Sequence, residues 1–176
     1  GYGSPDADHE YYNGSTWSEQ TNLNSGRKSA GSGGVQTASI LFAGYTTTNV
    51  NNVETWNGSS WTEVAEVNTT RRGISSLGQT NTAILAVGGY TTTAVDNVES
   101  WNGSAWTEIA EILTTGYSAA GSGTSTEGLI INLTPGRGNQ YWNGSSWAEQ
   151  TDTNTEHSPG GGGSQQGSYT SALIFG

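Results

Sequence analysis

The chain has 176 residues, and its 15 acidic residues against five basic ones give a net charge of −10. This balance disfavours nucleic-acid partners, because phosphate binding needs clustered Lys and Arg. The absence of cysteine excludes disulfides, thiolate catalysis and Cys-ligated metals. Because no apolar run approaches the roughly 18 residues of a membrane span, we expect no membrane insertion.

A motif of the form aromatic-Asn-Gly-x-x-Trp occurs four times and divides the chain into repeats. Its copies stand about 44 residues apart, a spacing typical of one supersecondary unit in an array. We therefore expect a single repeat domain over residues 1–176. Its predicted units are approximately 40–83, 84–128, 129–171, and 172–176 joined with 1–39.

The third copy shows the predicted elements most clearly, in chain order. Residues 84–87 are a short apolar run typical of a buried strand, and residues 97–101 alternate as a strand does. Asn102 and Gly103, which both tolerate positive φ, predict a hairpin turn. The returning strand is then expected over residues 106–110.

Each unit also contains a strand of small residues, which we expect at the centre of the fold. Four antiparallel strands per unit are typical of a β-propeller blade. Four blades are few for a propeller, so the inner strands must crowd round a narrow axis and carry small side chains. The four candidates are residues 29–33, 73–77, 118–121 and 160–163.

Residues 86–90 (Ala-Val-Gly-Gly-Tyr), followed by 98–101 (Val-Glu-Ser-Trp) and 106–108 (Trp-Thr-Glu), resemble the kelch repeat. The resemblance implies an all-β fold, a β-propeller of four kelch-like four-stranded blades, with one blade closed by strands from both termini. Two units depart from the pattern: Gly44 stands alone where a double Gly is expected, and residues 132–135 lack it. The Thr-, Asn- and Gly-rich repeats are also similar to those of bacteriophage structural and tail proteins.

The two ends of the chain carry complementary parts of one repeat. Residues 175–176 followed by 1–2 match the Val-Gly-Gly-Tyr of residues 87–90, with Phe in place of Val. This match predicts that strands from both ends share a blade. Two arrangements satisfy it: a closed four-bladed monomer, or two chains in one eight-bladed ring, each lending two strands to the other.

Two loops with the same Tyr-Thr-Thr-Thr sequence are the best candidates for a contact surface. Function is often carried by loops on a rigid scaffold, and adjacent arginines near a channel mouth can bind an anion. Pairing of the arginines with the chain's carboxylates is the competing interpretation. The candidate binding residues are Tyr45, Thr46, Thr47, Tyr90, Thr91, Thr92, Arg71 and Arg72.

The paired Trp and the Glu two residues later recur in every unit. The Trp could stack on sugars, but their fixed offset around a hairpin favours the blade core. Because catalytic carboxylates act as a close pair, one Glu in each blade is better explained as repeated structure. These carboxylates are Glu19, Glu63, Glu108 and Glu149.

We predict no cofactor and no complete metal site. Asp6, Asp8 and Glu10 offer alternating oxygen ligands for Ca²⁺, but they lack the Gly and the distant Glu of a calcium loop. The repeated Asn-Gly-Ser turns also fit the N-glycosylation pattern. The acceptor residues would be Asn13, Asn57, Asn102 and Asn143.

Together these patterns predict a non-enzymatic structural or interaction module, extracellular or on a virion surface. The expected partners are protein or glycan, other copies of the chain, or a larger assembly. The alternatives are a glycan-binding lectin, and a glycoside hydrolase or lyase whose site the sequence does not reveal. The copper oxidases among kelch-like propellers need a Cys crosslinked to Tyr, so the lack of Cys excludes that chemistry.

Overall fold

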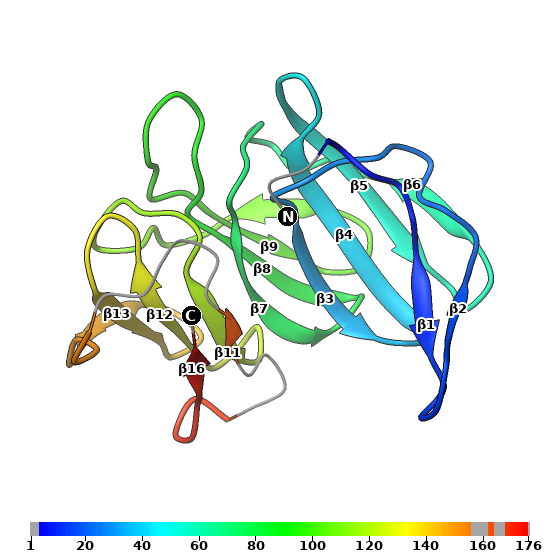
Figure 1. Ribbon diagram of the computed structural model, residues 1–176. Coiled ribbons are helices and arrows are strands. Elements are labelled where there is room, and N and C mark those ends of the chain that lie inside the picture. The colour runs from blue at the N-terminus through cyan, green and yellow to red at the C-terminus, as the bar shows by residue number, and fades with distance from the viewer. Residues whose placement is uncertain (1–3, 156–161, 164–167, 176) are drawn as a thin grey trace.

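The computed structural model describes residues 4–155, 162–163 and 168–175. Within these ranges the secondary structure consists of β-strands, with no helix, and therefore no helix able to cross a membrane. The strands form three four-stranded antiparallel sheets and two two-stranded ones. The predicted all-β fold is confirmed (Figure 1).

The three four-stranded sheets share one topology, in which consecutive strands are neighbours. The first contains β3 (Gly31–Val35), β4 (Ala38–Tyr45), β5 (Asn49–Trp56) and β6 (Trp61–Val64). The second contains β7 (Ser75–Thr80), β8 (Ala83–Val87), β9 (Val98–Trp101) and β10 (Trp106–Glu108). The third contains β11 (Ala120–Gly123), β12 (Gly128–Leu133), β13 (Gly138–Trp142) and β14 (Trp147–Gln150). Each sheet starts at its small-residue strand, so the unit predicted at 40–83 contains strands of two sheets.

The two-stranded sheets lie at opposite ends of this series. One pairs β1 (Glu10–Tyr12) with β2 (Trp17–Glu19), and the other pairs β15 (Gly162–Gly163) with β16 (Ile174–Phe175). In Figure 1, β1 and β2 lie beyond the first sheet, whereas β15 and β16 lie at the other end, where β15 contacts β11. Over the described ranges, β1 and β16 belong to separate sheets. The predicted junction of residues 176 and 1–2 lies outside those ranges, as do residues 160–161 of the fourth small-residue strand.

The small-residue strands lie together, as the sequence predicts. β7 packs between β3 and β11, and β15 packs against β11. A Cβ atom on Gly121 would collide with the carbonyl oxygen of Ser76, and one on Gly33 would collide with the Ile84 side chain. At Gly121, where the obstacle is backbone, only glycine therefore allows the third sheet to approach the second this closely.

The hydrophobic core fills the two spaces between the three whole sheets. Strand β8 contributes to both of them, because successive side chains of a strand point to opposite faces. Ile84 and Ala86 belong to the cluster shared with the first sheet, while Leu85 and Val87 belong to the cluster shared with the third. The second sheet is thus buried on both faces.

The paired Trp of the second and third sheets are part of this core, as predicted, whereas Trp61 of the first sheet is half-buried. Trp101 and Trp106 are buried, and their ring centroids lie 5.3 Å apart. The Trp106 Nε1–H donates to the Ala65 carbonyl of the preceding sheet (3.1 Å), and Trp147 donates to Ala110 in the same way (2.9 Å). These Trp therefore join one sheet to the next.

The Asn-Gly hairpin is present, but its turn differs from the expected one. Trp101 pairs with Trp106, so four residues form the loop, and in this loop positive φ is found at Gly103 (95°) and not at Asn102. The Asn102 side chain instead accepts the N–H groups of Ser104 and Ala105, both at 2.9 Å. Asn thus acts through its side-chain oxygen, as in an Asx turn.

Candidate functional site

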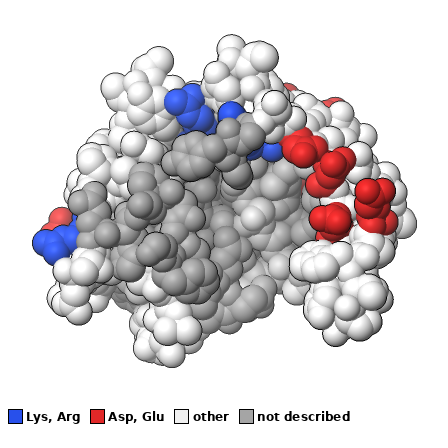
Figure 2. Space-filling model, viewed as in Figure 1, with Lys and Arg blue, Asp and Glu red and all other residues white. Residues whose placement is uncertain are grey.

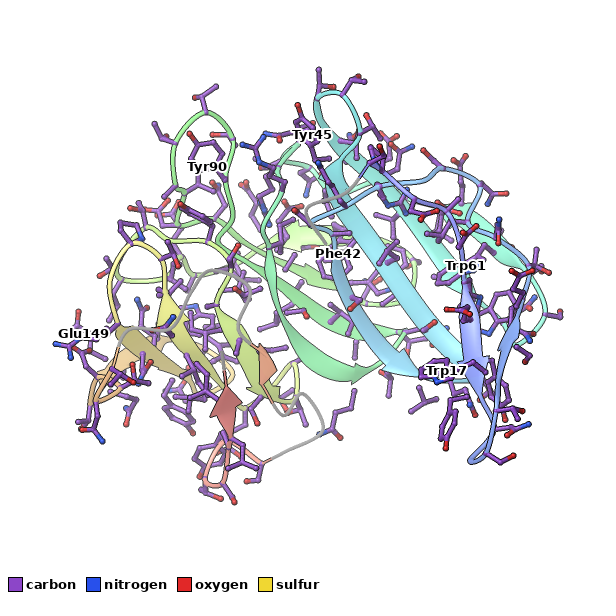
Figure 3. All side chains as sticks on the ribbon, viewed as in Figure 1. Trp17, Phe42, Tyr45, Trp61, Tyr90 and Glu149 are labelled. Carbon is purple, nitrogen blue, oxygen red and sulfur yellow. The ribbon has the colours of Figure 1, made fainter. Side chains whose placement is uncertain are left out.

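The end of each apolar strand is tied to the segment that enters a small-residue strand. Tyr45 and Lys28 exchange backbone hydrogen bonds (2.8 and 3.0 Å), and Tyr90 and Arg72 do the same (2.8 and 3.1 Å). In the third sheet, Tyr117 makes the corresponding bridge. This repeated bridge brings basic and aromatic side chains to one end of the sheets, where Figure 3 labels Tyr45 and Tyr90.

These side chains form a continuous cation–aromatic row, which consists of Lys28, Tyr45, Arg72, Tyr90 and Tyr117. The Arg72 guanidinium lies over both the Tyr45 ring (4.9 Å) and the Tyr90 ring (4.8 Å). The Lys28 ammonium lies 5.8 Å from the Tyr45 ring, and Tyr90 meets Tyr117 edge-on at 5.4 Å. All five side chains are half-buried. Cation–π contacts of this kind hold the row in a defined geometry.

Asn49 links the row to the neighbouring loop. Its Oδ1 accepts from Arg72 Nη1 at 3.0 Å, and its Nδ2 donates to the carbonyls of Tyr90 (3.1 Å) and Thr91 (2.8 Å). The two candidate loops, which belong to the first and second sheets, are therefore joined. Figure 2 shows basic side chains gathered between two protruding loops at this end.

The candidate threonines lie in these two loops. The Thr46 and Thr91 N–H groups donate to carbonyls two residues ahead, each at 3.0 Å. Thr47 and Thr92 are exposed at the loop tips. The structure therefore brings six candidate residues, Tyr45, Thr46, Thr47, Tyr90, Thr91 and Thr92, to one end together with Arg72.

Arg71 does not reach this surface, because its side chain is completely buried. Its Nη1 donates to Glu99 Oε1 at 2.9 Å, and its Nη2 donates to the Ala86 carbonyl at 3.2 Å. Burial lowers the pKa of the Arg71 guanidinium, while the Glu99 carboxylate opposes that shift. Arg27 and Glu54 form the equivalent buried pair (2.9 Å) in the first sheet. For Arg71, pairing with a carboxylate is therefore the interpretation that the structure supports.

The remaining candidates lie away from the row. Asp6 Oδ1 accepts from the Asp8 N–H (3.2 Å), and Asp8 Oδ1 accepts from Asn22 Nδ2 (3.1 Å). Among the described residues no group of three or more His, Asp or Glu side chains could hold a metal ion. Four outer-strand carboxylates are exposed on separate sheets: Glu19, Glu63, Glu108 and Glu149; Figure 3 labels the last of them.

The four predicted glycosylation residues share one structural role. Each Asn side chain is exposed in its turn and accepts the N–H groups two and three residues ahead. The turns thus account for these asparagines structurally, and their glycosylation stays a prediction. The residues are Asn13, Asn57, Asn102 and Asn143.

Lys28, Asn49 and Tyr117 belong to the site, although they are not among the candidate binding residues chosen from the sequence. Lys28 and Tyr117 occupy the repeat position of Arg72 in the other sheets, an equivalence that the sequence does show. The residue of the second loop that corresponds to Asn49 is Ala94. Asn49 is therefore not repeated, and the repeat pattern could not have identified it.

Comparisons of the chain with known proteins supply no relative from which a function could be transferred. No protein-family model matches the sequence, and no curated protein matches it either. The geometry of the site is thus the basis for inferring function.

Proposed function

We propose that the chain is a non-enzymatic structural or interaction module built as a β-propeller of four kelch-like blades. The fourth blade would be assembled from β1–β2 and β15–β16. Three four-stranded antiparallel sheets with adjacent small-residue strands support this architecture. The resemblance of the repeats to those of phage structural proteins supports a location outside the cell or on a virion.

The cation–aromatic row is the observation that carries the proposal of a contact surface. Arg and Tyr are among the residues that most often dominate binding energy at protein interfaces. Arg72 is already ordered by two rings and by Asn49, so it loses little conformational freedom when a partner binds. We therefore propose that a partner docks on the loop end, over Tyr45, Arg72 and Tyr90.

A protein partner fits this surface better than a sugar. Sugar rings stack on open aromatic faces, and the Arg72 guanidinium covers a face of both Tyr45 and Tyr90. The exposed hydroxyls of Thr47 and Thr92 favour the second candidate, a glycan-binding lectin.

A glycoside hydrolase or lyase fits the described residues least. Such enzymes act through a pair of carboxyl groups flanking a substrate. The completely buried carboxylates of the described ranges, Glu54 and Glu99, are each bound to an arginine, and the exposed outer-strand ones lie on separate sheets.

The test is a binding assay in which the chain is offered a glycan array and, separately, the proteins of the particle or cell surface that carries it. We expect retention by a protein and a loss of about tenfold or more in affinity with Arg72→Ala, as for an interface hot spot. Tyr141→Ser is the matched control, because Tyr141 is also half-buried but belongs to β13.

Two results would contradict the proposal. Sugar binding that is abolished by Tyr45→Ser and Tyr90→Ser would identify a lectin instead. Retention that is equally reduced by Tyr141→Ser would show that the loop end is not the contact surface.

A further inference from the structure

The two half-sheets repeat parts of the whole sheets in the same register. Phe175 pairs with Gly162, as Val87 pairs with Ser75 and Phe42 with Gly31. Strand β16 thus corresponds to β4, β8 and β12. Strands β1 and β2 correspond to the third and fourth strands of a sheet, because Tyr12 pairs with Trp17 as Trp101 pairs with Trp106.

Residues that are buried in the whole sheets are exposed in these half-sheets. Tyr12 is 45% exposed, whereas its equivalents Trp56, Trp101 and Trp142 are 2–3% exposed. Trp17 is 66% exposed, whereas its equivalents Trp106 and Trp147 are 7% and 6% exposed and Trp61 is half-buried. Figure 3 shows Trp17 at the edge of the molecule.

The Tyr12–Trp17 hairpin nevertheless has the geometry of a complete blade. Its ring centroids lie 5.2 Å apart at 39°, and those of Trp142 and Trp147 lie 5.1 Å apart at 39°. The exposure of Tyr12 and Trp17 therefore results from a missing neighbour and not from a distorted hairpin.

Each half-sheet is attached to a different neighbour within the chain. His9, next to β1, packs edge-on against Trp56 (4.7 Å) and Trp61 (5.4 Å) of the first sheet. On the other side, Tyr169 packs against Tyr141 (4.9 Å), and Ser122 Oγ donates to the Ser168 carbonyl (3.4 Å). With both attachments made, β1 and β16 lie apart (Figure 1).

We propose that β1 pairs with β16 of a second copy of this chain, which creates the four-stranded sheet β15–β16–β1–β2 across the two molecules. An unpaired strand edge is a template for another strand. Strand β1 corresponds to the third strand of a whole sheet but, within the described ranges, has no second strand beside it, and β16 corresponds to that second strand. The exchange is reciprocal, so a pair of chains completes two sheets, and both sets of attachments within each chain are retained. The proposal rests on the propeller architecture but not on the loop-end partner.

The repeat defines the contacts across this junction. Glu99 pairs with Ala86 and Glu54 with Leu41. In the half-sheets, Glu10 occupies the repeat position of these glutamates, and Ile174 occupies that of their partners. Glu10 is therefore expected opposite Ile174 of the second copy. Trp106 and Trp147 donate to carbonyls of the preceding sheet. By the same spacing, Trp17 Nε1 would donate to the Thr151 carbonyl of the second copy.

The first test is the mass of the chain in solution by analytical ultracentrifugation. We expect a species of twice 18.3 kDa that dissociates on dilution. Since each copy carries a net charge of −10, association should strengthen with added salt. A double variant, Tyr12→Ser with Trp17→Ser, should be monomeric, whereas Val35→Ser, which changes an exposed residue (50%) of β3, should still dimerise. A wild-type chain that stays monomeric at every concentration would contradict the proposal.

The second test places cysteines at the junction of this Cys-free chain. A Glu10→Cys chain mixed with an Ile174→Cys chain should form a disulfide-linked heterodimer. Glu19→Cys is the matched control, because Glu19 lies directly opposite Glu10 but in β2, one strand farther from the junction. A double variant that carries both junction cysteines distinguishes pairing between two chains from pairing within one chain.

If that double variant is crosslinked within one chain, the ring closes in a monomer. The proposed pairing with a second copy is then wrong, whereas the propeller architecture is still supported. If neither mixture nor double variant is crosslinked, the fourth blade itself is wrong. Circular dichroism of each variant checks that the sheets are intact.

Discussion

The second and third sheets have the same topology, but they differ at one buried polar site, which holds an ion pair in the second sheet and an amide in the third. In the second sheet, Arg71 binds Glu99, and Glu99 Oε2 accepts the Asn68 N–H at 2.7 Å. In the third sheet, Gln140 accepts the Leu113 N–H at 2.8 Å. Gln140 thus replaces Glu99, and the same backbone hydrogen bond is kept.

The residue at the arginine position differs between the two sheets, as does the residue at the position of its acidic partner. Gly116 stands where the second sheet has Arg71, and a Cβ there would lie only 2.7 Å from the Leu133 side chain. Conversely, Gly89 stands where the third sheet has Leu133, and a Cβ there would meet Arg71 at 3.1 Å. The charge pair is therefore removed as a unit, because a buried carboxylate without its cation is costly.

The largest expected effect follows from breaking the pair in the second sheet. Arg71→Gly leaves the Glu99 carboxylate buried without its cation, and the free energy of unfolding should fall by about 3–5 kcal/mol. Urea denaturation measures this loss. Adding Glu99→Gln, which imitates the third sheet, should recover part of it; a double variant less stable than Arg71→Gly would contradict the comparison.

The reverse change tests the third sheet. Gln140→Glu introduces a buried carboxyl with no arginine, and we expect a loss of about 2 kcal/mol at pH 7. Burial raises the pKa of such a group, so the loss should develop above the unfolded-state pKa of about 4.3 and vanish below it. Urea titrations at pH 4 and pH 7 check the sign. Glu149→Gln, at an exposed position of the same sheet, should change stability little at either pH.

A smaller effect is expected from the hairpin turns of the two sheets. Asn102→Ala and Asn143→Ala each remove a side-chain acceptor of two backbone N–H groups, at a cost of about 1 kcal/mol. Asn143 also donates to Ser146 Oγ at 3.1 Å, whereas the other loop has Ala105. Thermal unfolding should therefore show the larger loss for Asn143→Ala, and equal losses would mean that this extra bond contributes nothing.

The smallest effect is local to the third sheet. The Tyr141 hydroxyl donates to Glu127 Oε1 at 2.7 Å, and this bond raises the pKa of Tyr141 to about 12. Ultraviolet titration should therefore detect one tyrosine that ionises late, and Glu127→Gln should return it toward 10. Since the neutral phenol is favoured on folding, any stability it contributes is present below pH 10 and is lost as the pH rises to about 12.

Repetition and local patterning predicted much of the fold. The strand over 84–87, the hairpins at the Asn-Gly motifs and the adjacent small-residue strands all appear, because alternation, turn chemistry and close packing are encoded by nearby residues. Tyr45, expected in a loop, is instead the last residue of β4, and the role of Tyr45 and Tyr90 in binding stays a prediction. The turn geometry at Asn102 was wrong, because its side chain provides the hydrogen bonds that a two-residue turn would supply through the backbone.

The amino-acid sequence alone determined the all-β class, the repeat and the positions of the hairpins, since these depend on periodicity and on residues close in the chain. Only the tertiary structure decided that Arg71 is buried against Glu99 while Arg72 lies between Tyr45 and Tyr90. It also separated β1 from β16. These outcomes depend on contacts between different sheets, where burial, available volume and the pairing of charges are decided by residues far apart in the chain.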